Sequence, residues 1–354
     1  MKNAALPEEG YERKKHSALK RTLTVLGCIV LFIALLFGGF IGYFRLPVQK
    51  YYRASEKAFI IPDTNDGFIA QGISFDERTQ NFFVTGYMKD KSRSPVYLVP
   101  KGVKNEYKTL YLQAEDGGAY TGHCGGLSVH GDYIYVAGGA ENALYVYSYA
   151  QAIALKDGED LPCLGTFSLE NGGDYLGAAF VSVWNDCLVV GEFYREGNYP
   201  TPESHKRVTA SGEKNEALAL CYPFALDGEG ESQFGLANAP TAAISMCGLV
   251  QGAYFEDGKA VLSCSYGMAF SRLYEYDLEK ATTGETIKAM GKTLPLYSLD
   301  NASLLREMKL PPMSEEIVAV DGKTYVMCES ASDKYIFGKF TGGKWCYATD
   351  LSRL

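Results

Sequence analysis

The sequence predicts an all-β protein, with a five-bladed β-propeller as the first choice, behind one apolar N-terminal segment. Its 354 residues are 47% hydrophobic and include 26 tyrosines, 18 phenylalanines and 38 glycines. Such a composition favours strands joined by turns. A unit of two apolar runs separated by a tight turn recurs about five times after residue 65. Only residues 22–44 depart from this pattern, because they form an unbroken apolar run of 23 residues without a charge.

The apolar run 22–44 is long enough to cross a bilayer core of about 30 Å as a helix. Five basic residues lie just before it, between Arg13 and Arg21, and three follow soon after, at Arg45, Lys50 and Arg53. The positive-inside rule therefore places the N-terminus in the cytoplasm. A cleaved signal peptide is the alternative, but its apolar region usually has about 7 to 15 residues and ends near an A-x-A-like site, which is not found here. We expect an uncleaved signal-anchor.

This reading divides the chain into four parts. Residues 1–21 form a cytoplasmic tail, 22–44 a transmembrane helix, 45–64 a linker and 65–354 an extracytoplasmic propeller. The protein is then a single-pass component of the cell membrane, held there by its N-terminal helix.

The charge distribution argues against a nucleic-acid partner. The whole chain carries −8 and the first 45 residues carry +4, which leaves −12 for the remainder. Nucleic-acid binding depends on basic patches that neutralise phosphates. Eight cysteines follow residue 45, but none forms a CxxC pair, so we expect no zinc site and assign no metal or cofactor.

The repeats begin near residues 71, 124, 178, 251 and 315, and the clearest copy runs from Gln251 to Asp277 with a turn at Asp257-Gly258. Their spacing is close to the period of about 40 to 50 residues of propeller blades once loops are allowed for. The segment 57–61 could supply an extra strand that closes the ring. Six or seven irregular blades remain an alternative, and a β-sandwich would not require the recurring signature.

The longest stretch outside the repeats is 195–218, rich in Pro, Gly and charged residues. Long ordered insertions in compact domains are often functional, whereas a mobile surface loop is the alternative. His205 beside Glu203 could act as a ligand or a base there, although an exposed histidine in a polar loop is usually only solvated.

Aligning the repeats on the turn between their first two strands brings polar residues to equivalent positions. One set lies at the start of the first strand and the other after the second strand. We expect these places near opposite ends of the central channel, so the alignment predicts two rings. The first ring contains Gln71, His123, Gln251 and Glu315 with Glu316, and the second contains Glu192, Ser265 and Glu329.

Carboxylates gathered around a narrow axis raise one another's pKa values or hold a cation such as Ca²⁺. The alternative is that these groups cap strand ends and bind water. Tyr266 could stack on a ligand or wedge neighbouring blades apart. The candidate ligand-binding residues are Gln71, His123, Gln251, Ser265, Tyr266, Glu315, Glu316 and Lys334.

One stretch resembles a known family. Gln251-Gly252, Ser265-Tyr266-Gly267 and Ser271 resemble the plant-type glutaminyl cyclases, five-bladed propellers in which a Gln-Gly strand start is followed by Glu-Ser-Thr-Gly, Tyr-Gly and Ser. The resemblance covers 27 residues. It implies acyl transfer at peptide N-termini, but the family's catalytic glutamate falls at Ser263, so no catalytic acid carries over in this copy. The chain also resembles secreted bacterial propellers of unassigned function.

Two functions follow as hypotheses. The first is a membrane-tethered propeller that binds a small molecule, a peptide or a protein through the axial residues and the 195–218 segment. The second is a glutaminyl cyclase-like acyl transferase, in which Glu329 or Glu192 protonates the departing ammonia and Lys334, Gln251 or His123 assists.

Overall fold

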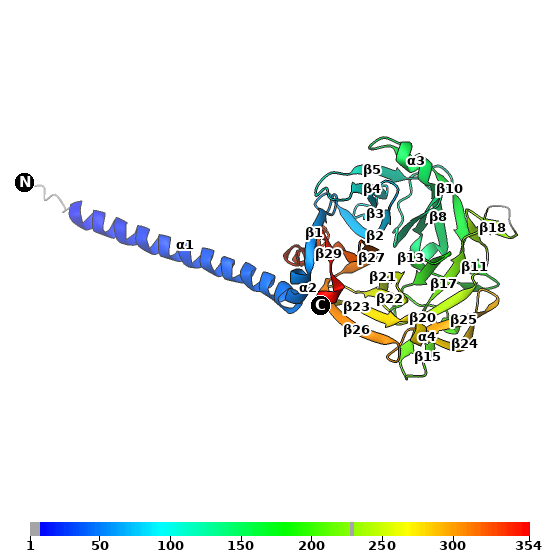
Figure 1. Cartoon of the computed structure of the whole chain (residues 1–354). Coiled ribbons are helices and arrows are strands. Elements are labelled where there is room, and N and C mark those ends of the chain that lie inside the picture. The colour runs from blue at the N-terminus through cyan, green and yellow to red at the C-terminus, as the bar shows by residue number, and fades with distance from the viewer. Residues whose placement is uncertain (1–7, 227–229) are drawn as a thin grey trace, which may run out of the picture.

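The computed structural model describes residues 8–226 and 230–354 and confirms the predicted fold. An apolar helix, α1 (Glu8–Arg45), precedes five four-stranded antiparallel blades. Figure 1 shows the blades arranged radially and α1 projecting from one side. Residues 1–7 of the expected cytoplasmic tail lie outside the described residues.

The first strand of each blade lies innermost. These five strands contact one another in cyclic order, from blade 1 through blade 5 and back to blade 1. Blade 1 consists of β2 (Phe68–Asp76), β3 (Asn81–Met88), β4 (Pro95–Pro100) and β5 (Lys108–Leu112). Blade 2 consists of β6 (Leu127–His130), β7 (Tyr133–Ala137), β8 (Ala143–Ser148) and β10 (Cys163–Ser168). Blade 3 consists of β13 (Ala178–Trp184), β14 (Cys187–Glu192), β17 (Ala217–Pro223) and β20 (Ala242–Met246). Blade 4 consists of β21 (Val250–Glu256), β22 (Lys259–Cys264), β23 (Phe270–Asp277) and β26 (Leu304–Pro312). Blade 5 consists of β27 (Ser314–Val320), β28 (Lys323–Cys328), β29 (Trp345–Thr349) and β1 (Ser55–Ile60).

Short elements decorate the blades. A hairpin of β24 (Thr282–Ala289) and β25 (Lys292–Ser298) leaves blade 4 and extends blade 3, where β25 runs parallel to β20. The single strand β9 (Asp160–Leu161) extends blade 1. The remaining elements are β11 (Glu170–Asn171), β12 (Asp174–Tyr175), β15 (Arg207–Val208), β16 (Lys214–Asn215), β18 (Ser232–Gln233), β19 (Leu236–Ala237), α2 (Gln49–Ala54), α3 (Tyr149–Ala154), α4 (Leu278–Ala281), η1 (Leu46–Val48), η2 (Gly139–Glu141), η3 (Glu203–His205), η4 (Glu329–Ala331), η5 (Phe337–Phe340) and η6 (Leu351–Arg353).

The predicted turns are confirmed. Glu256 pairs with Lys259 around Asp257-Gly258, whose φ angles are +50° and +72°. Asp321-Gly322 repeats this geometry with φ angles of +50° and +70°. Two consecutive positive φ values are typical of the two-residue hairpin loops that Asp-Gly favours. The repeated sequence signal therefore marks a repeated backbone conformation.

The N-terminal strand closes the propeller. β1 pairs antiparallel with β29, Ser55 opposite Thr349 and Ile60 opposite Trp345. It lies inside the segment expected as a linker and includes most of the 57–61 stretch expected to supply an extra strand. A ring whose last blade mixes both chain ends has no exposed seam between its first and last blades.

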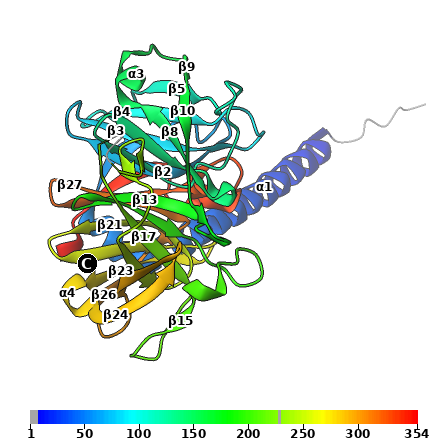
Figure 2. The same cartoon turned by 90° about the vertical axis from the view of Figure 1, so that its right-hand side faces the viewer.

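The apolar run 22–44 lies within α1, and its large apolar side chains are exposed up to Tyr43, whereas Phe44 is buried. The segment is long and apolar enough to span a membrane. Figure 2 shows the helix leaving the propeller obliquely. Since the run packs little against the blades, its exposed surface needs an apolar environment.

Candidate functional site at the propeller axis

The two predicted rings lie at the same end of the axis, so the expectation that they lie at opposite ends of the central channel is wrong. Ser314, at the start of β27, pairs with Cys328, at the end of β28. Antiparallel pairing always places the start of the first strand beside the end of the second. As a result Gln71 Nε2 of the predicted first ring donates a hydrogen bond to Glu329 Oε2 of the second across 3.0 Å.

Glu316 fills the middle of the axis. Its side chain accepts backbone N–H bonds from Ile73 at 2.7 Å, Leu127 at 2.9 Å and Val181 at 3.1 Å. These donors belong to, or begin, the inner strands of blades 1, 2 and 3. Burial raises the pKa of Glu316, and the three N–H donors oppose that rise. Glu316 therefore ties four inner strands together and is a structural group.

Glycines make room for this side chain. A Cβ at Gly126 would lie 2.6 Å from Glu316 Oε1, and one at Gly252 would lie 2.4 Å from the Cα of Glu316. Both distances are shorter than atomic contacts allow. The Gln251-Gly252 pair that carries the family resemblance thus has a packing role next to the axis.

At the strand-start end of the axis lies a group that we call the axial acidic cluster, formed by Gln71, Glu315, Glu329 and Tyr335. Glu329 accepts hydrogen bonds from Gln71 Nε2 at 3.0 Å and from the hydroxyl of Tyr335 at 2.9 Å. Glu315 is only 1% exposed, and its Oε2 has no hydrogen-bond partner among the described residues. An unpaired buried carboxyl oxygen is costly, so this atom is a natural contact point for a ligand.

Burial and like charge raise the pKa values of both carboxyl groups. For Glu315 the causes are burial first, then the charges of Glu329 and Glu316. Burial also raises the pKa of Glu329, against the bond from Tyr335, the charge of Lys334 and the bond from Gln71. The raised pKa values favour the protonated form of these groups, which is the form that donates a hydrogen bond or acts as a general acid.

Three more side chains form a rim above the cluster, in which His123 and Lys334 are exposed and Tyr87 is half-buried. Lys334 Nζ donates to the Tyr87 hydroxyl at 2.5 Å and lies 4.9 Å from the centre of the Tyr87 ring. The His123 ring stacks on Tyr87 with centroids 4.6 Å apart. Partial desolvation and then the charge of Lys334 lower the pKa of His123 to about 4, so the imidazole is neutral at pH 7. The rim thus combines one cation with two flat rings.

The three candidate residues of blade 4, Gln251, Ser265 and Tyr266, make no hydrogen bond to the axial acidic cluster in the part of the chain that the structure describes. Gln251 sits in the bulge between Val250 and Gly252, the place that Gln71 has in blade 1. Ser265 is buried, and its Oγ has no hydrogen-bond partner within the described residues. The guanidinium of Arg195 lies 3.9 Å from the ring centre of Tyr266.

Glu192 is held by the 195–218 segment. His205 Nδ1 lies 3.0 Å from both Glu192 carboxylate oxygens, and His205 Nε2 lies 3.2 Å from Asp174 Oδ1. Leu218 N–H also donates to Glu192. The expectation of an exposed, solvated His205 is wrong, because the imidazole is completely buried between two carboxylates. Among the described residues, Glu192 and Glu329 share no hydrogen-bond partner, so the two carboxyl groups lie in separate environments.

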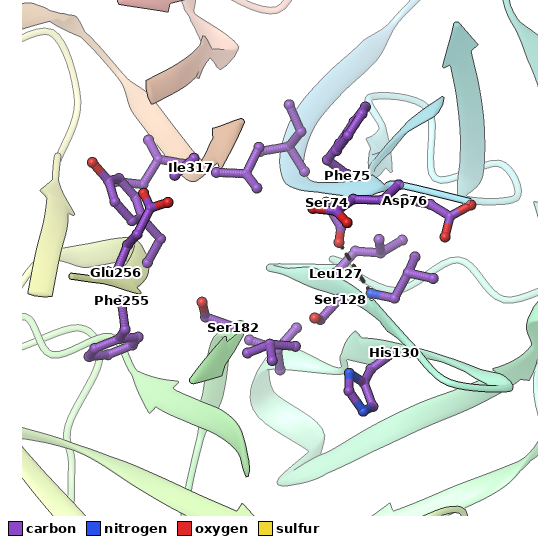
Figure 3. Close-up of a pocket in the computed structure, with 18 of the residues that line it drawn as sticks. Ser74, Phe75, Asp76, Leu127, Ser128, His130, Ser182, Phe255, Glu256 and Ile317 are labelled. Carbon is purple, nitrogen blue, oxygen red and sulfur yellow. Dashed lines mark hydrogen bonds between the residues drawn. The ribbon is translucent and has the colours of Figure 1, made fainter. Parts of the chain in front are cut away.

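At the opposite end of the axis lies a cavity of about 580 Å³, lined by the later halves of the inner strands. Figure 3 shows Ser74, Ser128 and Ser182 on three neighbouring strands around it. Of its acidic residues, Glu77 and Glu256 are exposed, and the buried Asp76 already accepts bonds from Arg78, Thr79 and Tyr149. The cavity therefore offers hydroxyls and a satisfied ion pair, a weaker chemical signal than an unpaired buried carboxyl.

Sequence reasoning missed Tyr335 and these serines. The serines stand two residues beyond Gly72, Gly126 and Phe180, so a finer alignment of the inner strands could have found them. Within residues 8–226 and 230–354, no group of three or more His, Cys, Asp or Glu side chains is arranged to hold a metal ion.

No family model and no curated protein matches the chain. The solved structures that it resembles include Myxococcus xanthus glutaminyl cyclase, with a TM-score of 0.40 and 10% identity over 83% of this chain and 93% of that one. Another is the PQQ-bound aldose sugar dehydrogenase of Streptomyces coelicolor, with a TM-score of 0.42 and 10% identity over 83% and 95% of the two chains. Scores this low carry no functional information.

Proposed function

We propose that this chain is a single-pass membrane protein whose extracytoplasmic propeller binds a ligand bearing a free amine or an amide at the axial acidic cluster. The observation that carries the proposal is the buried, unpartnered Oε2 of Glu315 beside Glu329. An ionised carboxylate accepts hydrogen bonds, and a protonated one also donates. A peptide N-terminus or side-chain amide supplies the matching groups.

The rim supports this ligand class. Lys334 is exposed, and its charge opposes the rise in the pKa values of Glu315 and Glu329. The ammonium group of a ligand can replace Lys334 as the positive charge near the two carboxyl groups if the Lys334 side chain moves outward. Tyr87 and His123 then provide flat surfaces for the adjoining part of the ligand.

The test uses the full chain in a neutral detergent and measures its thermal unfolding with short peptides. A peptide with a free N-terminus should stabilise the protein, while its N-acetylated form should not, because acetylation removes the amine. Glu315→Gln should remove the difference, and the exposed control Glu106→Gln should retain it. Equal effects of the two peptides on the wild-type protein would contradict the proposal.

A glutaminyl cyclase-like acyl transferase is the second candidate, and one contact favours it. The Oγ atoms of Ser263, where the resemblance places the family's catalytic glutamate, and of Ser314 lie 2.9 Å apart. Glu315 follows Ser314 directly, so a carboxyl from the neighbouring strand could replace the missing acid. In this reaction the amine attacks the side-chain amide carbonyl, the C–N bond to the amide nitrogen breaks, and ammonia leaves after protonation.

The same peptides separate the two candidates when the first residue is glutamine. Release of ammonia, followed by mass spectrometry of the peptide, would support the acyl transferase, and Glu329→Gln should then abolish it. Stabilisation without ammonia release would support binding alone.

A further inference from the structure

A second cavity lies where α1 meets the propeller, and none of the four residues of the axial acidic cluster lines it. Its volume is about 580 Å³. Its lining residues include four basic side chains and no Asp or Glu, which is unusual in an outer domain of net charge −12. The side chains that the argument uses are Arg45, Lys57, Lys339, Lys344 and Trp345.

Two of the four cations lie beside the indole of Trp345, and the other two make hydrogen bonds at the cavity wall. The ammonium groups of Lys57 and Lys344 lie 5.2 and 5.7 Å from the Trp345 ring centre. Lys339 Nζ donates to Asn65 Oδ1 at 2.8 Å, and Arg45 Nε donates to the Phe340 carbonyl at 3.1 Å. Each ammonium has three donor hydrogens and a guanidinium has five, so these contacts leave donors for an anion.

The cavity is located at the end of the apolar run. Arg45 follows Phe44 directly and lines the cavity. The helix η5 packs on α1 just below this point, with ring centroids 5.6 Å apart for Phe37 and Phe340 and 5.3 Å for Phe40 and Phe337. At 1.5 Å per residue, Phe37 lies only about 10 Å along the helix from Phe44.

The loop that carries η5 also exposes large apolar side chains. Ile336 is 80% exposed and Phe337 is 49% exposed. They are continuous with the exposed apolar surface of α1 through Phe40. If residues 22–44 span the bilayer, these side chains lie at the hydrocarbon boundary with the basic cavity directly above them.

We propose that the basic cavity binds the headgroup phosphate of an anionic phospholipid in the leaflet from which the propeller emerges. Ile336 and Phe337 insert among its acyl chains. The inference rests on the membrane anchoring proposed above but not on the axial ligand. Aromatic residues and cations at the level of the headgroups are a known feature of membrane interfaces. The arrangement joins apolar insertion to a charged recess, as a lipid with a charged head and apolar tails requires.

The test titrates the full chain, in neutral detergent, with a short-chain phosphatidylglycerol, a short-chain phosphatidylcholine and glycerol phosphate, with bound molecules counted by native mass spectrometry. Phosphatidylglycerol should bind most tightly. The double variant Lys339→Gln with Lys344→Gln should weaken it by roughly tenfold or more, because charge-assisted bonds to phosphate are lost. The matched control, Lys288→Gln with Lys292→Gln, removes two exposed lysines from β24 and β25 and should bind as wild type.

Three outcomes would overturn the proposal. Equal losses in the cavity variant and the control would show general attraction to charge. Equal affinity for the phosphatidylcholine would show that the four cations do not distinguish an anionic lipid from a zwitterionic one. Binding of glycerol phosphate as tightly as the lipid, with no effect of Ile336→Ser and Phe337→Ser, would identify a soluble phosphate instead of a lipid. Unchanged thermal unfolding of each variant excludes misfolding.

The axial variant Glu315→Gln should retain full lipid binding, so failure of the axial proposal leaves this result untouched. Membrane anchoring is tested separately by protease protection, so a failure of the anchoring can be distinguished from a failure of the lipid site.

Discussion

Gln71 Nε2 and Glu329 Oε2 lie 3.0 Å apart, although 258 positions separate these residues in the chain. The contact joins the innermost strand of blade 1 to η4, which directly follows the second strand of blade 5. It brings a neutral donor to a carboxyl group whose pKa burial already raises. Glu329 is thus both a link between blades and a candidate ligand group, and these two roles give different results when it is changed.

Glu329→Gln should remove most of the stabilisation that an amine-bearing peptide gives, while the unliganded melting temperature changes little. The lost carboxyl contacts cost about 1 kcal/mol, and relief of the repulsion from Glu315 offsets this cost. Thermal unfolding with and without peptide measures both effects. A lower unliganded melting temperature with intact peptide stabilisation would mean that Glu329 only links the strands.

Glu315→Gln should stabilise the unliganded protein, and more so as the pH rises. The folded protein holds the Glu315 proton more tightly than the unfolded chain, because burial raises the pKa of Glu315. Wild-type stability therefore falls as the pH rises above the unfolded pKa of about 4.3. The melting temperature of the variant should exceed that of the wild type more at about pH 8 than at about pH 5. A constant difference would show that Glu315 does not titrate differently on folding.

Glu316→Gln should have the opposite effect on stability. The amide nitrogen would face at least one of the N–H groups of Ile73, Leu127 and Val181, and a stranded buried donor costs about 1–3 kcal/mol. Urea unfolding measures the loss at neutral pH, with Glu315→Gln as the neighbouring comparison. Equal stability of Glu316→Gln and the wild type would be incompatible with a stabilising role for the three backbone N–H bonds to Glu316.

His205→Gln should destabilise the protein more in mild acid than in mild base. Burial lowers the pKa of His205, but Glu192 and Asp174 outweigh it and raise the pKa overall. The stabilisation is therefore complete below the unfolded pKa of about 6.5 and disappears as the pH rises through the folded pKa.

His130→Gln should show the opposite pH dependence and serves as the control. Burial and then the charge of Arg78 lower the pKa of His130, so its contribution is lost as the pH falls. Melting temperatures at about pH 6 and pH 9 should show the two histidine variants diverging in opposite directions. Parallel pH profiles would argue against the Glu192–His205–Asp174 arrangement.

Protease added to intact cells or spheroplasts should digest the region beyond Phe44 and leave a tag at Met1 intact. The basic residues before the apolar run predict a cytoplasmic N-terminus. The same experiment after membrane permeabilisation, which should remove the tag, is the control. Loss of the tag in intact cells would reverse the topology.

The local features of this fold could be predicted from the sequence because they depend on neighbours in the chain. Asp257-Gly258 marks a turn through backbone conformation alone, and the apolar run 22–44 marks a helix through its length. The alignment of the repeats also gathered Gln71, Glu315 and Glu329 as candidates. It placed them in two rings because the direction of the strand pairing was not considered.

Other features depend on contacts between distant segments. The burial of His205 requires Asp174 and Glu192 from other parts of the chain, and no local pattern distinguishes it from a solvated histidine. The basic cavity unites Arg45 with Lys339 and Lys344, almost 300 positions away. Only the closure of blade 5 brings them together.

The pairing of β1 with β29 also has a consequence for biogenesis. Residues 55–60 leave the ribosome early, yet their partner at 345–349 is synthesised almost last. Such a long-range contact slows folding, since the intervening chain must be ordered first. A membrane-inserted α1 would hold β1 at the bilayer surface throughout this interval, so that blade 5 is completed there. The unpaired edge of β1 would then be kept away from the solution, where it could pair with other chains.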